Sequence, residues 1–179
     1  MADLEARVVF DQMYAAHHQT LHAYFLGRTS DPELALDLLQ DTFVRLWRNL
    51  QAVGHLASER QRAWLFSVAR NLVIDQHRAL STRRATQQAL ADAAATANSS
   101  APPADMEVAV SEKLQELDLA IRDLPEDLRV VLVLSVVGER TSTEVGELLG
   151  RPPGTVRYQL AEARRRVAHN LRLLDLVNQ

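Results

Sequence analysis

The chain has 179 residues, of which 24% are charged and 47% hydrophobic. This composition is typical of a folded globular protein of one large or two small domains, and it excludes a disordered chain. Cysteine is absent, which excludes disulfides, thiolate zinc sites and cysteine nucleophiles. Since no apolar run reaches membrane-spanning length and the first ten residues lack a signal-peptide core, we expect a cytoplasmic protein without membrane insertion.

The charges are unevenly distributed along the chain. The formal net charge is −3, which differs from the strongly basic balance of a stand-alone DNA-binding protein. Residues 91–130 hold nine acidic and three basic residues, whereas both flanking stretches are slightly basic. Every cation except Lys113 is an arginine, a side chain suited to bidentate contact with phosphate, carboxylate or guanine.

The first half of the chain predicts three helices. Residues 4–28 form one or two helices with a shared apolar face, and 27–30 are expected to break them. Asp31 and Pro32 are a favoured helix start. The expected buried stripe of that second helix is Leu36, Leu39, Phe43, Leu46 or Trp47, and Leu50. A loop over residues 51–59 and a helix over 60–80 with a basic, amide-bearing face follow.

Two polar patterns in this half have competing interpretations. Glu33, Asp37 and Asp41 recur every four residues, which indicates either a solvated helix face or a contact surface for a basic partner helix. His18 and His22 are also four residues apart, but too few further ligands lie near them, so we predict no metal site. Since phosphate-cradling loops and nucleophile elbows are also absent, the sequence predicts no catalytic residues and no enzyme activity.

Helical periodicity fades from about residue 85, where alanine, serine and a Pro-Pro pair indicate a flexible linker. We therefore predict a first domain over 1–90, a linker over 91–110 and a second domain over 111–179. Helices are expected from Ser111 to Leu124 and over residues 128–137, which are apolar almost all round. A strand is the alternative for that β-branched run, but the flanking helical patterns and the lack of a partner strand argue against it.

The stretch from Thr141 to Val167 predicts a helix-turn-helix. Thr141 and Glu144 form a capping box, and Gly150 is a natural helix end. Gly146 lies in mid-helix, where a tiny residue is expected if a second helix crosses closely. Apolar residues from Val156 onward recur every three or four positions.

The outward face of the second helix carries Thr155, Arg157, Tyr158, Gln159, Ala161, Glu162 and Arg165. Such a face fits a DNA major groove, although an ordinary helical hairpin with a solvated arginine-rich face is the alternative.

Taken in order, three segments of the chain resemble the group IV bacterial sigma factors, the extracytoplasmic-function (ECF) type. The motifs are DLLQDTF at Asp37–Phe43, ARNLVID at Ala69–Asp75, Leu-Pro-Glu before the helix-turn-helix, and Gly-Thr-Val at Gly154–Val156. The resemblance runs from about Phe10 to Leu171. It implies an all-α protein of two small helical domains joined by a flexible linker. The first half is most similar to the branch tied to iron-uptake signalling.

The resemblance also implies partners and roles for particular residues. The first domain would dock on the clamp helices of the largest RNA polymerase subunit, and the second on the flap of the second-largest. The implied docking residues are Asp37, Gln40 and Asp41.

The implied −10 element contacts are the loop 51–59 with Arg45 and Asn71, while Arg78, Arg83 and Arg84 follow the phosphates. The implied −35 element contacts are Thr155, Arg157, Tyr158, Ala161 and Glu162, with Arg164 and Arg165 on the backbone. An anti-sigma factor would hold the protein inactive, and no cofactor, metal or small-molecule substrate is implied.

Departures from the family pattern concern the recognition helix and the linker. Where the family often has Lys-Ser-Arg, this chain has Arg157, Tyr158 and Gln159, and Glu162 stands where a basic residue is common. An acid near DNA is repelled by phosphate or accepts from a cytosine amine, so we predict an unusual −35 preference. The acidic linker would either mimic nucleic acid in the polymerase channel or keep the free domains off DNA.

Two alternatives belong to other functional classes. A free-standing helix-turn-helix repressor would bind duplex DNA as a symmetric dimer. A protein-binding sigma mimic in a partner-switching cascade would keep the docking helices but lose the arginines of the groove face, and Arg157 with Arg164–Arg166 argue against it. A helical adaptor protein is the least specific interpretation.

Overall fold

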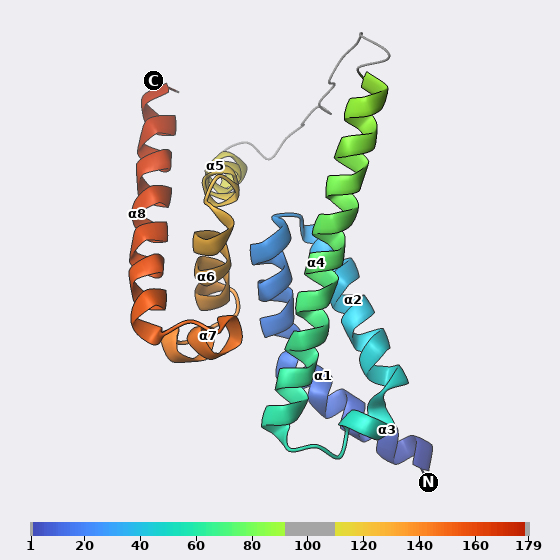
Figure 1. Cartoon of the computed structure of the whole chain (residues 1–179). Helices are drawn as coiled ribbons and strands as arrows, with labels where there is room; N and C mark the ends of the chain where they lie inside the picture. Colours follow the sequence, from blue (N-terminus) through green and yellow to red (C-terminus); the bar gives the residue numbers. More distant parts are fainter. Residues whose placement is uncertain (1, 92–109, 178–179) are drawn as a thin grey trace.

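The computed structural model describes residues 2–91 and 110–177, with side chains described at 4–81 and 115–171. Within these ranges all regular structure is helical, as predicted. The first four helices are α1 (Ala2–Thr29), α2 (Pro32–Arg48), α3 (Leu50–Val53) and α4 (Ser58–Ala91). The second four are α5 (Val110–Arg122), α6 (Glu126–Val136), α7 (Ser142–Leu149) and α8 (Pro153–Val177). Figure 1 shows the two groups side by side, with α6 facing the C-terminal half of α1.

The start of α2 is set by local sequence, as predicted. The Asp31 carboxylate accepts hydrogen bonds from the backbone N–H groups of Glu33 (3.0 Å) and Leu34 (3.1 Å), and Pro32 follows at the first helical position. Such a cap contributes about 1 kcal/mol to helix stability. The turn before α2 is tight because Ser30 adopts a positive φ of 57°.

The predicted inward face of α2 was wrong at Leu36, and of the two alternatives Leu46 and Trp47 it is Leu46 that is buried. The buried residues are Ala35, Leu38, Leu39, Thr42, Phe43 and Leu46. This set follows the spacing of a helix that packs against both α1 and α4. Leu36 and Trp47 lie about 100° further around the helix from buried neighbours, and they are 55% and 45% exposed.

Three predicted boundaries in the first domain also need correction. The expected break at residues 27–30 is shorter, because α1 continues through Gly27 to Thr29. The expected loop 51–59 is helical at both ends, with α3 covering Leu50–Val53 and α4 starting at Ser58. Helix α4 continues to Ala91, beyond the expected fading of helix near residue 85. Most of the predicted linker, residues 92–109, lies outside the described residues. Its two predicted roles therefore stay predictions.

In the second domain, α6 is a helix, as predicted, and it is buried on two sides. Leu124, Leu128 and Leu132 pack with Ala163 and Val167 of α8. The opposite side of α6, including Val130, Val131 and Leu134, belongs to a larger core that is continuous with α1, α2 and α4. The apolar run therefore serves both domains, which explains why it has no polar face.

The helix-turn-helix is formed by α7 and α8, as the sequence predicts. The Thr141 backbone N–H donates to Glu144 Oε2 (2.9 Å) and the Glu144 N–H donates to Thr141 Oγ1 (3.3 Å), which completes the capping box. Gly150 ends α7 in the left-handed conformation, with φ of 67°. The expected reason for Gly146 was wrong: a Cβ there would lie 2.5 Å from the Arg151 carbonyl oxygen, so it is the turn backbone that passes closely.

The two domains pack directly against each other. Helix α1 contacts α6 as extensively as it contacts α2. At the closest point, a Cβ on Gly27 would lie 2.7 Å from the Val130 Cα, so glycine is needed there for the helices to approach. None of the helices in the described ranges is long and apolar enough to cross a lipid bilayer.

Candidate functional site

The predicted docking residues lie beside an apolar groove between α1 and α2. Asp37, Gln40 and Asp41 are all exposed on α2, and Gln40 lines the groove. Its apolar lining includes Leu36, Val44 and Trp47, which are 55%, 40% and 45% exposed. The structure therefore presents carboxylates and apolar side chains on one helix face.

The groove residues were missed as functional candidates in the sequence. The signal was present, because α2 contains more apolar residues than its buried stripe of six can use. Phe10 and Trp47 pack edge to face with ring centroids 5.3 Å apart, which fixes the indole at the rim of the groove. An exposed but immobilised apolar surface of this kind is typical of protein contact sites.

The predicted −10 residues lie on two helices. Arg45 is exposed and continues the row of Asp37 and Asp41 along α2, because the three are four residues apart. Asn71 and Arg78 are exposed on α4 instead. Arg78 Nη1 lies 3.9 Å from the Asp75 carboxylate. Arg83 and Arg84 belong to α4, but their side chains lie outside the described set.

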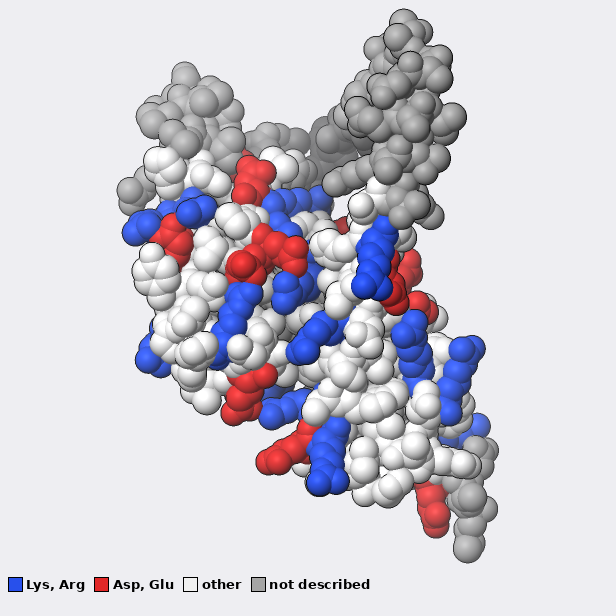
Figure 2. All heavy atoms as spheres, in the orientation of Figure 1, with Lys and Arg blue, Asp and Glu red and all other residues white. Residues whose placement is uncertain are grey.

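Arginines are not gathered into one basic patch on the face seen in Figure 2; basic and acidic side chains are interspersed over both halves. Long-range electrostatic attraction of DNA by this face is therefore weak, and binding must depend on local contacts. This agrees with the net charge of −3.

The predicted −35 residues form a largely exposed face on α8. The exposed members are Thr155, Arg157, Tyr158, Ala161, Arg164 and Arg165. Tyr158 is 72% exposed, the largest value among the exposed apolar and aromatic side chains described. The opposite face of α8 is anchored by the fully buried Val156 and Ala163. A rigid helix that presents hydrogen-bonding groups and cations outward fits a major groove.

Glu162 is less available on this face than expected. Its carboxylate accepts from Arg166 Nε at 2.7 Å and from Arg165 Nη2, and only 12% of its side chain is exposed. The hydrogen bond from Arg166, with the charges of both arginines, lowers the pKa of Glu162. The acid therefore neutralises two cations at the edge of the recognition face.

Gln159 is held in a similar way, by the turn that precedes α8. Arg151 Nη1 donates to Gln159 Oε1 (3.1 Å) and to the Asp127 carbonyl (3.3 Å), and Arg151 Nη2 bonds to the Asp127 carboxylate. Arg151 thus joins the turn both to the half-buried Gln159 of α8 and to Asp127 of α6, and Gln159 does not belong to the outward face. Thr155, Arg157 and Tyr158 are the exposed members of the predicted face in the first turns of α8.

Comparison with protein families matches both domains. The family model "Sigma-70 region 2" matches residues 13–83, and the model "Sigma-70, region 4" matches residues 114–167. The ECF RNA polymerase sigma factor SigL of Mycobacterium tuberculosis is 32% identical over 164 residues, which cover 92% of this chain and 89% of that protein. The chain belongs to the ECF RNA polymerase sigma factors. The region 2 match thus begins within α1 and ends within α4, and the region 4 match begins within α5 and ends within α8; the two groups of helices are called region 2 and region 4 below.

Other relatives agree with this assignment. The ECF sigma factor SigW of Bacillus subtilis is 28% identical over 153 residues, covering 82% of this chain and 79% of that protein. The sigma factor RpoE from Bartonella quintana, solved in complex with the anti-sigma factor NepR, aligns with a TM-score of 0.59 and 23% identity over 91% of this chain and 96% of that chain. CnrH, solved with the cytosolic domain of CnrY, aligns with a TM-score of 0.55 and 22% identity, over 93% and 88% of the two chains. At these identities the structures demonstrate a shared fold.

Proposed function

We propose that this protein directs core RNA polymerase to specific promoters and initiates transcription there, under the control of an anti-sigma factor. The observation that carries the proposal is the order of the two matched regions on two helical domains, with the recognition face of α8 exposed. The protein would act in the cytoplasm as a DNA-binding regulator and not as an enzyme. Assignment to the iron-uptake-signalling branch stays a prediction from the motifs of the first half.

The docking site on polymerase is proposed to be the groove between α1 and α2. Its exposed apolar side chains supply area to bury, at about 25 cal/mol per Å². Asp37 and Asp41 at its edge favour a partner surface with basic side chains, such as the clamp helices. The same groove suits an anti-sigma factor, because a partner that occupies it keeps polymerase away.

Promoter DNA is proposed to contact both domains. Unpaired −10 DNA needs a basic path for its backbone and a site for a flipped base. The support for α4 in this role is the exposure of Asn71 and Arg78 on one helix. For the −35 duplex, Arg157, Tyr158 and Ala161 would face base edges, and Arg164 and Arg165 the phosphates.

The test is run-off transcription with purified core polymerase on genomic promoter fragments. We expect discrete transcripts only when the protein is added. A variant with Asp37→Ala and Trp47→Ala changes the groove alone and is expected to abolish the transcripts while region 4 still binds duplex DNA. A matched control is Leu4→Ala, which removes a leucine that is 69% exposed at the start of α1. If the protein binds core polymerase yet never programmes initiation, the proposal is wrong.

A further inference from the structure

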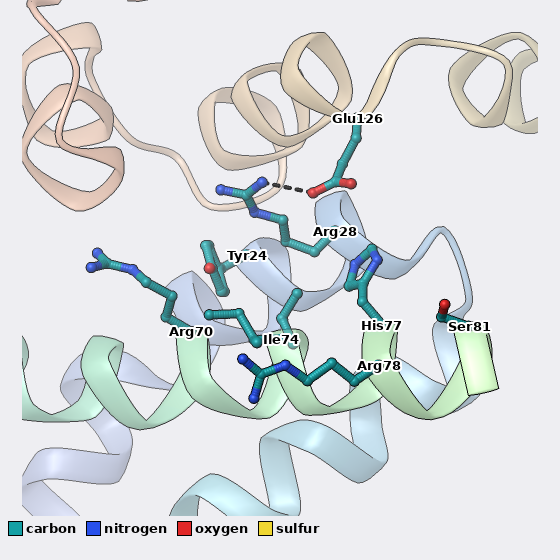
Figure 3. A pocket seen from close by; sticks show the side chains of 9 residues that line it. Tyr24, Arg28, Arg70, Ile74, His77, Arg78, Ser81 and Glu126 are labelled. Carbon is teal, nitrogen blue, oxygen red and sulfur yellow. Dashed lines mark hydrogen bonds and ion pairs between the residues drawn. The ribbon is translucent and has the colours of Figure 1, made fainter.

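A basic pocket lies at the junction of the two domains. It is lined by Tyr24 and Arg28 of α1, by Arg70, His77, Arg78 and Ser81 of α4, and by Glu126 of α6. Figure 3 shows Glu126 reaching toward Arg28, while Arg70, His77 and Arg78 project from α4. Three arginines therefore line the pocket, and the carboxylate that bonds to one of them, Arg28, belongs to the other domain. Arg28 and Arg70 were absent from the residues predicted to contact DNA.

Arg28 holds the carboxylate of region 4 in place. Its Nη1 donates to Glu126 Oε1 at 2.7 Å, and its guanidinium carbon lies 5.4 Å from the centre of the Tyr24 ring. Burial opposes the charge of Arg28, but the hydrogen bond to Glu126 and the further interactions with Tyr24 and Glu126 together outweigh it and raise the pKa of Arg28, so the guanidinium stays cationic. Its Nε is buried without a hydrogen-bond partner among the described residues. The donor that a phosphate could take over is therefore Nη1, which Glu126 holds in the closed arrangement.

The pocket is part of a larger junction that closes region 4 onto region 2. Arg129 Nε donates to the Gly27 carbonyl (3.1 Å), and Arg62 Nη2 bonds to Glu147 Oε2 (3.0 Å). Arg140 Nε donates to Thr20 Oγ1 at 2.9 Å. Around these bonds Val130, Val131 and Leu134 of α6 are buried in the core shared with α1. Hydrogen bonds and an ion pair therefore accompany the buried apolar contact, as in a specific domain interface.

This closed arrangement is incompatible with the open promoter complex. Helix α8 packs on α6 and α6 on α1, so two interaxial steps separate region 4's reading helix from region 2 by about 20 Å. The −10 and −35 elements are about 25 base pairs apart, or roughly 85 Å at 3.4 Å per pair. The domains must therefore separate to read both elements.

We propose that Glu126 occupies a phosphate site for unpaired promoter DNA in this pocket, so that region 4 and the DNA strand compete for Arg28, with Arg70 and Arg78 lining the path of the strand beside it. The proposal rests on the proposed promoter function. It adds Arg28 and Arg70 to the DNA-binding residues. It also makes the free protein self-inhibited: removing the carboxylate, or forcing α6 away from α1, opens the pocket to single-stranded DNA.

The first arm of the test measures closure without polymerase or DNA. Because the chain has no cysteine, Ala15→Cys and Ala168→Cys, both at exposed positions on α1 and α8, give one fluorophore in each domain. We expect efficient energy transfer in the parent, and a marked loss with Gly27→Ala, whose Cβ would press on the Val130 backbone, and with Glu126→Arg. Combining Glu126→Arg with Arg28→Glu should restore the transfer. Low transfer in the parent would overturn the closed state.

The second arm measures binding of a fluorescent twelve-nucleotide oligodeoxythymidylate to the full chain. We expect Glu126→Gln to tighten binding roughly threefold, the scale of one partly exposed ion pair, and Gly27→Ala roughly tenfold. Adding Arg28→Ala to Gly27→Ala should remove most of that gain. The matched control Asp123→Asn makes the same charge change at an exposed carboxylate three residues before Glu126 and should leave binding unchanged.

Equal affinity of the parent and Glu126→Gln for the oligonucleotide, or an equal gain with Asp123→Asn, would overturn the competition. Neither arm uses polymerase, so this failure is separate from failure of the proposed function. A protein that closes and opens as described but never programmes run-off transcription would contradict the promoter function alone.

Discussion

Helices α2 and α8 are both amphipathic, but their outward faces differ in kind. The outward face of α2 combines carboxylates with the exposed apolar Leu36, Val44 and Trp47. The outward face of α8 carries Arg157, Tyr158 and a chain of ion pairs around Glu162. Apolar area gives affinity for a protein surface, whereas hydrogen-bonding groups and cations give affinity for DNA. The two faces therefore suit different kinds of partner.

The largest expected effect comes from making the α2 face polar. Leu36→Asp should weaken binding of core polymerase by at least tenfold, because it removes apolar contact area and places a carboxylate in the apolar groove, where binding would strip it of water. Binding of −35 duplex DNA should not change. Titration of labelled protein with core polymerase measures the effect, and Leu4→Asp, at another exposed leucine, is the control. Equal loss in both variants would show that the α2 face has no special role.

The α8 face depends on how closely the turn passes α7. Gly146→Ala should lower the free energy of unfolding by about 1–3 kcal/mol, the usual cost of overpacking, because the new Cβ would lie 2.5 Å from the Arg151 carbonyl oxygen. Gly154→Ala is the matched control, since the atom nearest to its Cβ is 3.9 Å away. Urea denaturation of both variants distinguishes the two sites. A Gly146→Ala variant as stable as the parent would contradict the close approach.

The ion pairs of α8 give a smaller, DNA-specific effect. Glu162→Gln frees Arg165 and Arg166 for phosphate, so duplex affinity should rise severalfold and its salt dependence should steepen. Glu162→Ala should also change the relative affinity for −35 sequence variants, if the carboxylate contributes to base readout. Fluorescence anisotropy at several salt concentrations measures both. An unchanged order of −35 variants with Glu162→Ala would contradict the predicted unusual preference.

The smallest effect concerns the cap of α7, which supports α8. Hydrogen bonds from the Thr141 backbone and hydroxyl, with one from Arg140, lower the pKa of Glu144 to about 2. The unfolded carboxyl titrates near its ordinary value of 4.5, so the stability gained from this cap is fully present above that pH. It is lost as the pH falls from about 4.5 to about 2.

Thermal unfolding across this range should therefore fall less steeply in Glu144→Gln than in the parent. The control is Glu139→Gln, at an exposed glutamate five residues earlier, and it should follow the parent. Identical pH profiles for Glu144→Gln and the parent would mean that the cap contributes nothing in solution.

Local signals made much of this fold predictable. Asp31 with Pro32, the Thr141–Glu144 box and Gly150 each act within a few residues, and the structure confirms all three. The apolar run over residues 128–137 predicted a buried helix because neighbouring patterns were helical. The motifs around Asp37 and Gly154 then led to the family.

What could not be predicted depends on contacts between distant segments. The exposure of Leu36 and Trp47 follows from the angle at which α2 meets α1 and α4, which no local pattern contains. Gly27 was taken for a helix break because its partner, Val130, is far away in sequence. Glu162 was expected to face the groove, but its two arginine partners could only be chosen once the side chains were in place.

The central claim is that the protein reads two promoter elements as part of RNA polymerase. The most direct measurement is a footprint of one promoter with the protein alone and with core polymerase added. The account predicts an asymmetric footprint over the −35 and −10 elements, with open −10 DNA, only when both are present. Tight protection of a palindromic operator by a dimer of the protein alone, unchanged by polymerase, would contradict it.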